Sequence, residues 1–103
     1  MASKYHSKKE IVDGVKFASK REAQRYRDLR LLERAGAIHG LELQPKFALK
    51  VNGKLVCNYI ADFAYFTGTS RVYEDSKGFK TPAYRIKKKL LMALNPGLDH
   101  REV

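Results

Sequence analysis

Two adjacent stretches rich in aromatic and β-branched residues constrain the fold of this chain more than any other feature. Residues 59–66 read YIADFAYF and residues 71–78 read RVYEDSKG, and a short polar segment, TGTS, separates them. Such runs around a turn sequence predict two neighbouring antiparallel strands. Because side chains alternate between the faces of a strand, we expect Asp75 and Lys77 on one face, with Asp62 of the neighbouring strand beside them. Two carboxylates with an ammonium group are the outline of a metal site.

Further strands are predicted from turn residues. An Asp-Gly pair predicts a small hairpin over residues 11–17, and an Asn-Gly pair predicts a second hairpin between residues 46–51 and a long strand over residues 54–66. An apolar stretch at residues 38–43 ends before a proline. With residues 71–77 as a third strand, the pattern indicates a β-meander.

Two helices complete the expected fold. Apolar residues at spacings of three predict a helix over residues 19–35, and a Thr-Pro pair predicts the start of a second helix over residues 81–94. An Asn-Pro-Gly sequence ends the second helix, and residues 98–103 are expected to form a short final strand. The sequence thus predicts an α/β (α+β) fold with an αβββαβ core, in which helices flank a mixed sheet.

Length and composition indicate one folded domain. The chain has 103 residues, of which 44% are hydrophobic, so it is large enough for one core and too small for two. We expect a single domain over residues 1–103, with a basic arm and short hairpin at residues 1–18 and the core at residues 19–103. The one cysteine, Cys57, and the lack of a signal-like segment favour a reducing, cytoplasmic setting.

The formal net charge of +10 indicates a polyanionic partner. Nucleic acid is the commonest such partner, and an anionic membrane surface is the alternative. No apolar run reaches the roughly 20 residues of a membrane-spanning helix. The candidate DNA-binding cations lie in the arm and on or before the two helices: Lys8, Lys9, Lys20, Arg21, Arg25, Lys80, Arg85, Lys87 and Lys88.

The acidic residues have structural as well as catalytic interpretations. An exposed ion pair between Asp75 and Lys77 would be worth less than about 1 kcal/mol and would carry no function. Asp62 lies in an apolar run, where an unpaired charge costs several kcal/mol, so a functional role is favoured. Glu74 is expected on the opposite face, as a structural or solvated residue. The three histidines form no recognisable pattern.

Glu22 has two competing interpretations. Residues 19–22 read SKRE, the pattern of a capping box, in which Glu22 would bond back to the backbone N–H of Ser19. This local role explains the glutamate fully. The alternative is that Glu22 belongs to the metal site.

Three acidic blocks resemble the bacteriophage endonuclease I group of Holliday-junction resolvases, which belong to the PD-(D/E)xK nuclease superfamily. The blocks are FASKRE at residues 17–22, Ala61-Asp62-Phe63, and YEDSKG at residues 73–78. The closing segment, residues 90–103, is also similar, as are small phage-encoded proteins of the same nuclease type. Alanine stands at position 61, where the superfamily name has proline.

The resemblance implies a restriction-endonuclease-like fold and a metal-dependent endonuclease that acts on branched DNA in recombination. Glu22, Asp62 and Asp75 would bind Mg²⁺ or Mn²⁺, and Lys77 would orient or deprotonate the water or stabilise the phosphate. It also implies a homodimer and a phage-encoded protein in the host cytoplasm. In the endonuclease I group a swapped strand bridge brings the first-helix acid from the partner subunit, and whether residues 38–48 form such a bridge here is left open. The alternatives are a nuclease on ordinary duplex or flapped DNA, and a non-catalytic nucleic-acid-binding protein.

Overall fold

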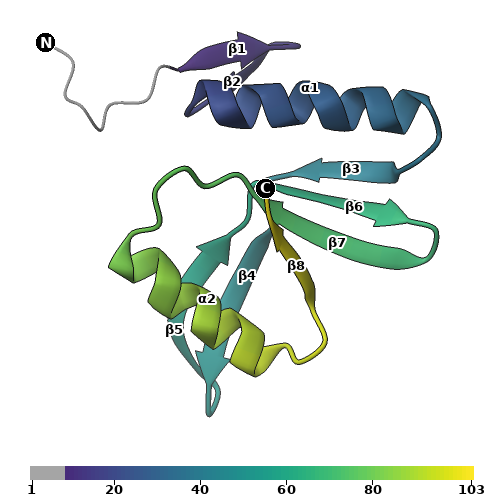
Figure 1. Cartoon of the computed structure of the whole chain (residues 1–103). Helices are drawn as coiled ribbons and strands as arrows, with labels where there is room; N and C mark the ends of the chain where they lie inside the picture. The colour runs from purple at the N-terminus through teal and green to yellow at the C-terminus, as the bar shows by residue number, and fades with distance from the viewer. Residues whose placement is uncertain (1–8) are drawn as a thin grey trace, which may run out of the picture.

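The structure is a computed structural model that describes residues 9–103, and the predicted contact residue Lys8 lies outside this part of the chain. Its two helices and eight strands follow one another in the order shown in Figure 1. In chain order they are β1 (Glu10–Val12), β2 (Val15–Phe17), α1 (Lys20–Arg34), β3 (His39–Leu43), β4 (Lys46–Val51), β5 (Lys54–Ile60), β6 (Phe63–Thr67), β7 (Ser70–Asp75), α2 (Pro82–Leu94) and β8 (Asp99–Glu102).

The central sheet has four strands in the order β3-β6-β7-β8. Strands β3, β6 and β7 are antiparallel to their neighbours, whereas β8 pairs parallel with β7 after the crossover through α2. The elements α1, β3, β6, β7, α2 and β8 follow the expected αβββαβ order, and the predicted mixed α+β fold is confirmed. The predicted β-meander is wrong, because β3, and not the strand at residues 46–51, pairs with β6. The hairpin β4–β5 is an insertion between β3 and β6 and forms a sheet of its own.

The element boundaries follow the local signals in the sequence. Ser19 and Thr81 are the N-caps of α1 and α2, and each side chain accepts a hydrogen bond from the backbone three residues later. In the β4–β5 turn, Asn52 and Gly53 have φ angles of 51° and 76°. Positive φ at both central residues is what a type I′ hairpin turn requires. These helix starts and this turn are confirmed.

The long strand predicted over residues 54–66 is wrong, because it divides into β5 and β6. Ala61 and Asp62 lie between them, where the chain changes partner from β4 to β3 and β7. The Ala61 N–H donates to the Pro45 carbonyl at 3.0 Å, and the Asp62 N–H donates to the Glu74 carbonyl at 3.0 Å. Asp62 therefore lies at a break in the strand rather than within it.

The sheet has a hydrophobic core on each side. On the α1 side, residues of β6 and β7 such as Phe63 and Val72 pack with Phe17 and Leu29. On the other side, Leu91 of α2 packs against residues of the β4–β5 hairpin. Figure 1 shows α1 with the β1–β2 hairpin above the strands and α2 with β4 and β5 below. Alternating side chains of β7 consequently enter different cores.

Candidate active site

Asp62 is held at the strand break by three hydrogen bonds to the backbone. Its N–H donates to Glu74, and its carbonyl accepts from the Gln44 N–H at 3.0 Å. Its side-chain Oδ2 accepts from the Ser76 N–H at 2.7 Å. The carboxyl group is thus fixed between the end of β7 and the β3–β4 connection, with little rotational freedom.

Glu22 of α1 and Asp62 of the strand break form a carboxyl pair. Both line a cavity of about 180 Å³ together with Gln44 and residues of β2 and β3. Burial raises the pKa of Asp62 from its ordinary 3.8 to about 7, and a hydrogen bond with Glu22 and the Glu22 charge act in the same direction. The Ser76 N–H and the Lys77 charge oppose this shift. The Asp62 carboxyl group therefore keeps its proton to a higher pH than an ordinary aspartic acid does.

The two interpretations of Glu22 are compatible in this geometry. The Ser19 hydroxyl accepts from the Glu22 N–H at 3.1 Å, which is the forward half of a capping box. The return bond to Glu22 Oε2 comes from the Ala18 N–H at 3.2 Å, one residue before the expected donor. The cap fixes the first turn of α1, and the same side chain interacts with Asp62.

Asp75 lies in a second network on the opposite face of β7 from Glu74. Its side chain is 0% exposed, and Oδ2 accepts a hydrogen bond from the Tyr59 hydroxyl. His100 Nε2 of β8 lies 2.6 Å from the same oxygen. Asp75 Oδ1 is buried and has no hydrogen-bond partner among residues 9–103. This carboxyl group is oriented through Oδ2, and its other oxygen forms an ion pair with Lys77.

Lys77 connects the two networks. Its Nζ lies 3.8 Å from Asp75 Oδ1, and its positive charge also acts on Asp62. The ammonium group lies 5.4 Å from the centre of the Tyr84 ring of α2. Asp75 and Lys77 are therefore not an exposed surface pair, because the carboxylate is fully buried.

A divalent cation fits the donor groups of the Glu22–Asp62 pair. Mg²⁺ prefers oxygen ligands and is commonly held by one or two carboxylates, with water and substrate oxygens completing its shell. A dication beside these groups would also offset the burial and the Glu22 charge that raise the pKa of Asp62. Among the described residues, no group of three or more acidic, histidine or cysteine side chains could hold a metal. The three-carboxylate site that includes Asp75 stays a prediction.

Glu74 and Arg25 form a buried ion pair between β7 and α1. Glu74 is 0% exposed, and Arg25 donates two hydrogen bonds to it, at 2.8 Å and 2.7 Å. The Tyr65 hydroxyl donates a third. The expected separation of Glu74 from Asp75 is confirmed, but a solvated Glu74 is wrong. Arg25, a predicted DNA contact, is the counter-ion of Glu74, and its contact with DNA stays a prediction.

The other predicted contact residues have differing environments. Lys9, Lys20, Arg85 and Lys87 are exposed. Arg21 is exposed as well, and it donates to the Val103 carbonyl at 2.9 Å. Lys80 and Lys88 both contact a carboxylate of β8. Contact between these residues and DNA stays a prediction.

Three residues of these networks have no recognisable signal in the sequence. Tyr59 and His100 orient Asp75, so one of the three histidines, which form no recognisable pattern in the sequence, lies at this site. Gln44 lines the small cavity and has a φ of 52°, an uncommon value for a residue other than glycine. A parallel pairing of β8 with β7 would have indicated His100, but strand pairing is not a local property.

Comparison with known proteins places the chain in a family. None of the helices in residues 9–103 is long and apolar enough to cross a membrane. No curated protein matches the chain at a significant level. A family described as "Protein of unknown function (DUF1064)" matches residues 2–101. Because this match covers nearly the whole length, the chain belongs to the DUF1064 family.

Proposed function

We propose that this protein is a metal-dependent endonuclease that hydrolyses phosphodiester bonds in DNA. The observation that carries the proposal is the Glu22–Asp62 carboxyl pair in a small cavity, with Lys77 acting on Asp62 from the end of β7. Two carboxyl groups that line one small cavity cost folding free energy when both are ionised, and a functional site is a reason to keep them. Holding Mg²⁺ or Mn²⁺ is the purpose that their oxygen donors fit best.

The residues of the chain have separate tasks in this proposal. A bound divalent cation supplies charge neutralisation at the phosphate and makes a water molecule more acidic. Glu22 and Asp62 would hold the cation, and Asp75, which Tyr59 and His100 orient, would be a further oxygen donor.

The Lys77 ammonium group is the positive charge beside these acids. It stabilises the additional negative charge on the phosphate in the transition state, or positions the attacking water.

The net charge of +10 supports DNA as the substrate. Cations on and before α2 lie one strand away from Asp75, since β8 pairs with β7 and carries the carboxylate that they contact. The assignment of branched DNA, in particular a four-way junction, as the substrate rests on the resemblance to junction resolvases. So does a homodimer, which would cut two strands symmetrically.

Cleavage of a labelled four-way junction tests the proposal directly. The junction and its linear arms are incubated with Mg²⁺, Mn²⁺ or EDTA, using wild type and Asp75→Ala. We expect symmetric cuts near the branch that are lost with EDTA and with the variant, while the variant still binds DNA. If linear duplex is cut equally well, specificity for junctions is refuted and a general nuclease remains. Tight binding without cutting in either metal would refute the nuclease and leave a non-catalytic binding protein.

A further inference from the structure

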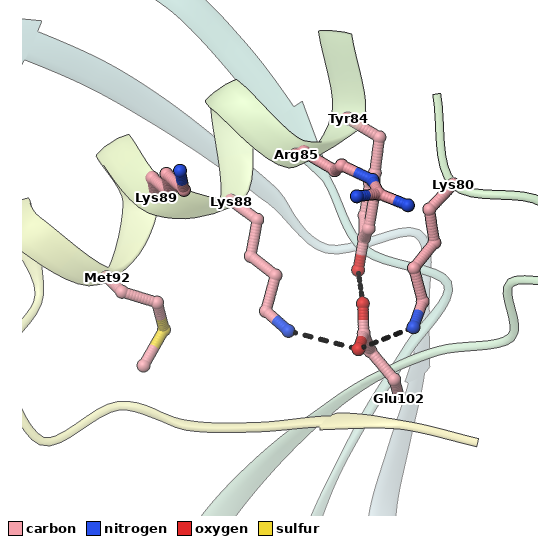
Figure 2. Close-up of a pocket in the computed structure, with 7 residues that line it drawn as sticks. All are labelled: Lys80, Tyr84, Arg85, Lys88, Lys89, Met92 and Glu102. Carbon is pink, nitrogen blue, oxygen red and sulfur yellow. Dashed lines mark hydrogen bonds and ion pairs between the residues drawn. The ribbon is translucent and has the colours of Figure 1, made fainter. Parts of the chain in front are cut away.

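A second cavity, of about 610 Å³, lies between α2 and β8. Figure 2 shows its lining, which contains four basic side chains and one carboxylate. The lining residues are Lys80, Tyr84, Arg85, Lys88, Lys89, Met92 and Glu102. Four cations against a single anion leave this cavity strongly positive, and its volume is sufficient for a phosphate group with its sugar.

The one carboxylate in this cavity, Glu102, lies where an anionic ligand would bind. Its Oε1 is 3.2 Å from both Lys80 Nζ and Lys88 Nζ, and its Oε2 accepts from the Tyr84 hydroxyl at 2.8 Å. Figure 2 shows the two lysines reaching it from opposite sides. The hydrogen bond from Tyr84, followed by those from the lysines, lowers the pKa of Glu102 to about 2. The residue is therefore an anion at any physiological pH.

We propose that this cavity binds a backbone phosphate of nucleic acid and that Glu102 is a built-in competitor for its lysines. The identity of the ligand as nucleic acid rests on the proposed function. Two ammonium groups that share one carboxylate oxygen have the spacing to share a phosphate oxygen in the same way. Arg85 and Lys89 supply further charge along α2.

The position of the cavity suits a phosphate next to the one that is cut. Glu102 is the register partner of Asp75 on the adjacent strand. Tyr84, which lines the cavity, is also the ring beside Lys77. A DNA strand bound in this cavity would therefore pass close to Asp75 and Lys77.

Glu102 opposes every phosphate that enters the cavity. An incoming phosphate must share the two lysines with the carboxylate or displace it, and the two anions repel each other. The effect is a lower affinity for any nucleic acid, independent of sequence. The alternative is that Glu102 only holds Lys80 and Lys88 in place, in which case its loss would weaken binding. The two roles predict opposite signs.

Binding of fluorescently labelled duplex and junction DNA in EDTA distinguishes these roles. Glu102→Gln keeps an acceptor for the Tyr84 hydroxyl but removes the negative charge. We expect about 3- to 10-fold tighter binding at low salt, and a log-log salt slope steeper by about 0.9. Glu42→Gln on β3 makes the same change of net charge at an ion pair with Arg71 of β7. We expect it to change the affinity for DNA by less than about twofold.

Two lysine variants test the cavity itself, independently of any structural role of Glu102. Lys88→Met should weaken binding by about 3- to 10-fold, whereas Lys54→Met at the exposed β5 start should change it by less than about twofold. Thermal melting verifies that each variant folds.

Three results would overturn the proposal. Glu102→Gln could bind DNA more weakly than wild type or equally well, or it could gain no more affinity than Glu42→Gln. Lys88→Met could bind DNA as tightly as wild type. Wild-type cleavage is measured separately, so the nuclease and the phosphate site can fail independently of each other.

Discussion

Replacing Asp62 with asparagine should make the folded protein more stable at neutral and alkaline pH. Asparagine has the shape of a protonated aspartic acid, so it keeps an acceptor for the Ser76 N–H and a donor toward Glu22. It cannot ionise, however, and so it removes the cost of a second negative charge in the cavity. The variant tests whether the carboxyl pair exists in solution.

The magnitude follows from the raised pKa of Asp62. The folded state holds this proton up to a pH of about 7, whereas the ordinary pKa is 3.8. In this interval the folded state binds more protons than the unfolded state, so stability falls as pH rises. The contribution is fully present below about pH 4 and is lost by about pH 8. At about 1.4 kcal/mol for each pH unit the limit is about 4 kcal/mol, and partial solvation of the side chain lowers our expectation to about 2 kcal/mol.

Urea unfolding of wild type and Asp62→Asn between pH 4 and pH 8, in EDTA, measures this effect. The chain has six tyrosines and no tryptophan, so tyrosine fluorescence or circular dichroism is the signal. We expect the two free energies of unfolding to converge near pH 4 and to differ by about 2 kcal/mol at pH 8, with equal urea dependence. If the free energies of unfolding of the two proteins change in parallel at all pH values, Asp62 has an ordinary pKa. The inferred interaction between Glu22 and Asp62 would then be refuted.

Two further predictions concern the networks on either side of β7. Arg25→Met should lower the free energy of unfolding, measured in urea, by about 3 kcal/mol or more, because Glu74 is left buried without its counter-ion. Arg27→Met removes a more exposed ion pair and should cost less than about 1 kcal/mol. Equal losses in the two variants would contradict the buried pair. Tyr59→Phe should reduce the cleavage rate by about tenfold without changing the affinity for DNA, because Asp75 loses the donor that orients it, and a change in affinity alone would argue against this role.

Sequence patterns predicted those parts of the fold that depend on a few neighbouring residues. The φ angles of Asn52 and Gly53 and the cap at Thr81 are encoded within two to four positions of the chain. The alternation of Glu74 and Asp75 also needs nothing beyond the strand itself. These features were predictable because no distant residue has to be known.

The features that sequence analysis missed depend on contacts between distant segments. The division of residues 54–66 occurs because the two halves pair with different strands, and both halves are equally β-prone. The bonds from Arg25 to Glu74 span 49 residues, so no local pattern indicates this ion pair. His100 reaches Asp75 only through the parallel pairing of β8 with β7.

Calorimetric titration with Mn²⁺ measures directly whether Glu22 and Asp62 together hold a divalent cation, because the affinity for the metal is obtained without any substrate. At pH 8, wild type should show saturable binding, and Asp62→Asn should bind at least about tenfold more weakly. Asp28→Asn removes one carboxylate from α1 away from the cavity and should bind like wild type. If Asp62→Asn binds Mn²⁺ as tightly as wild type does, the carboxyl pair is not the metal site and the proposed nuclease loses its main support.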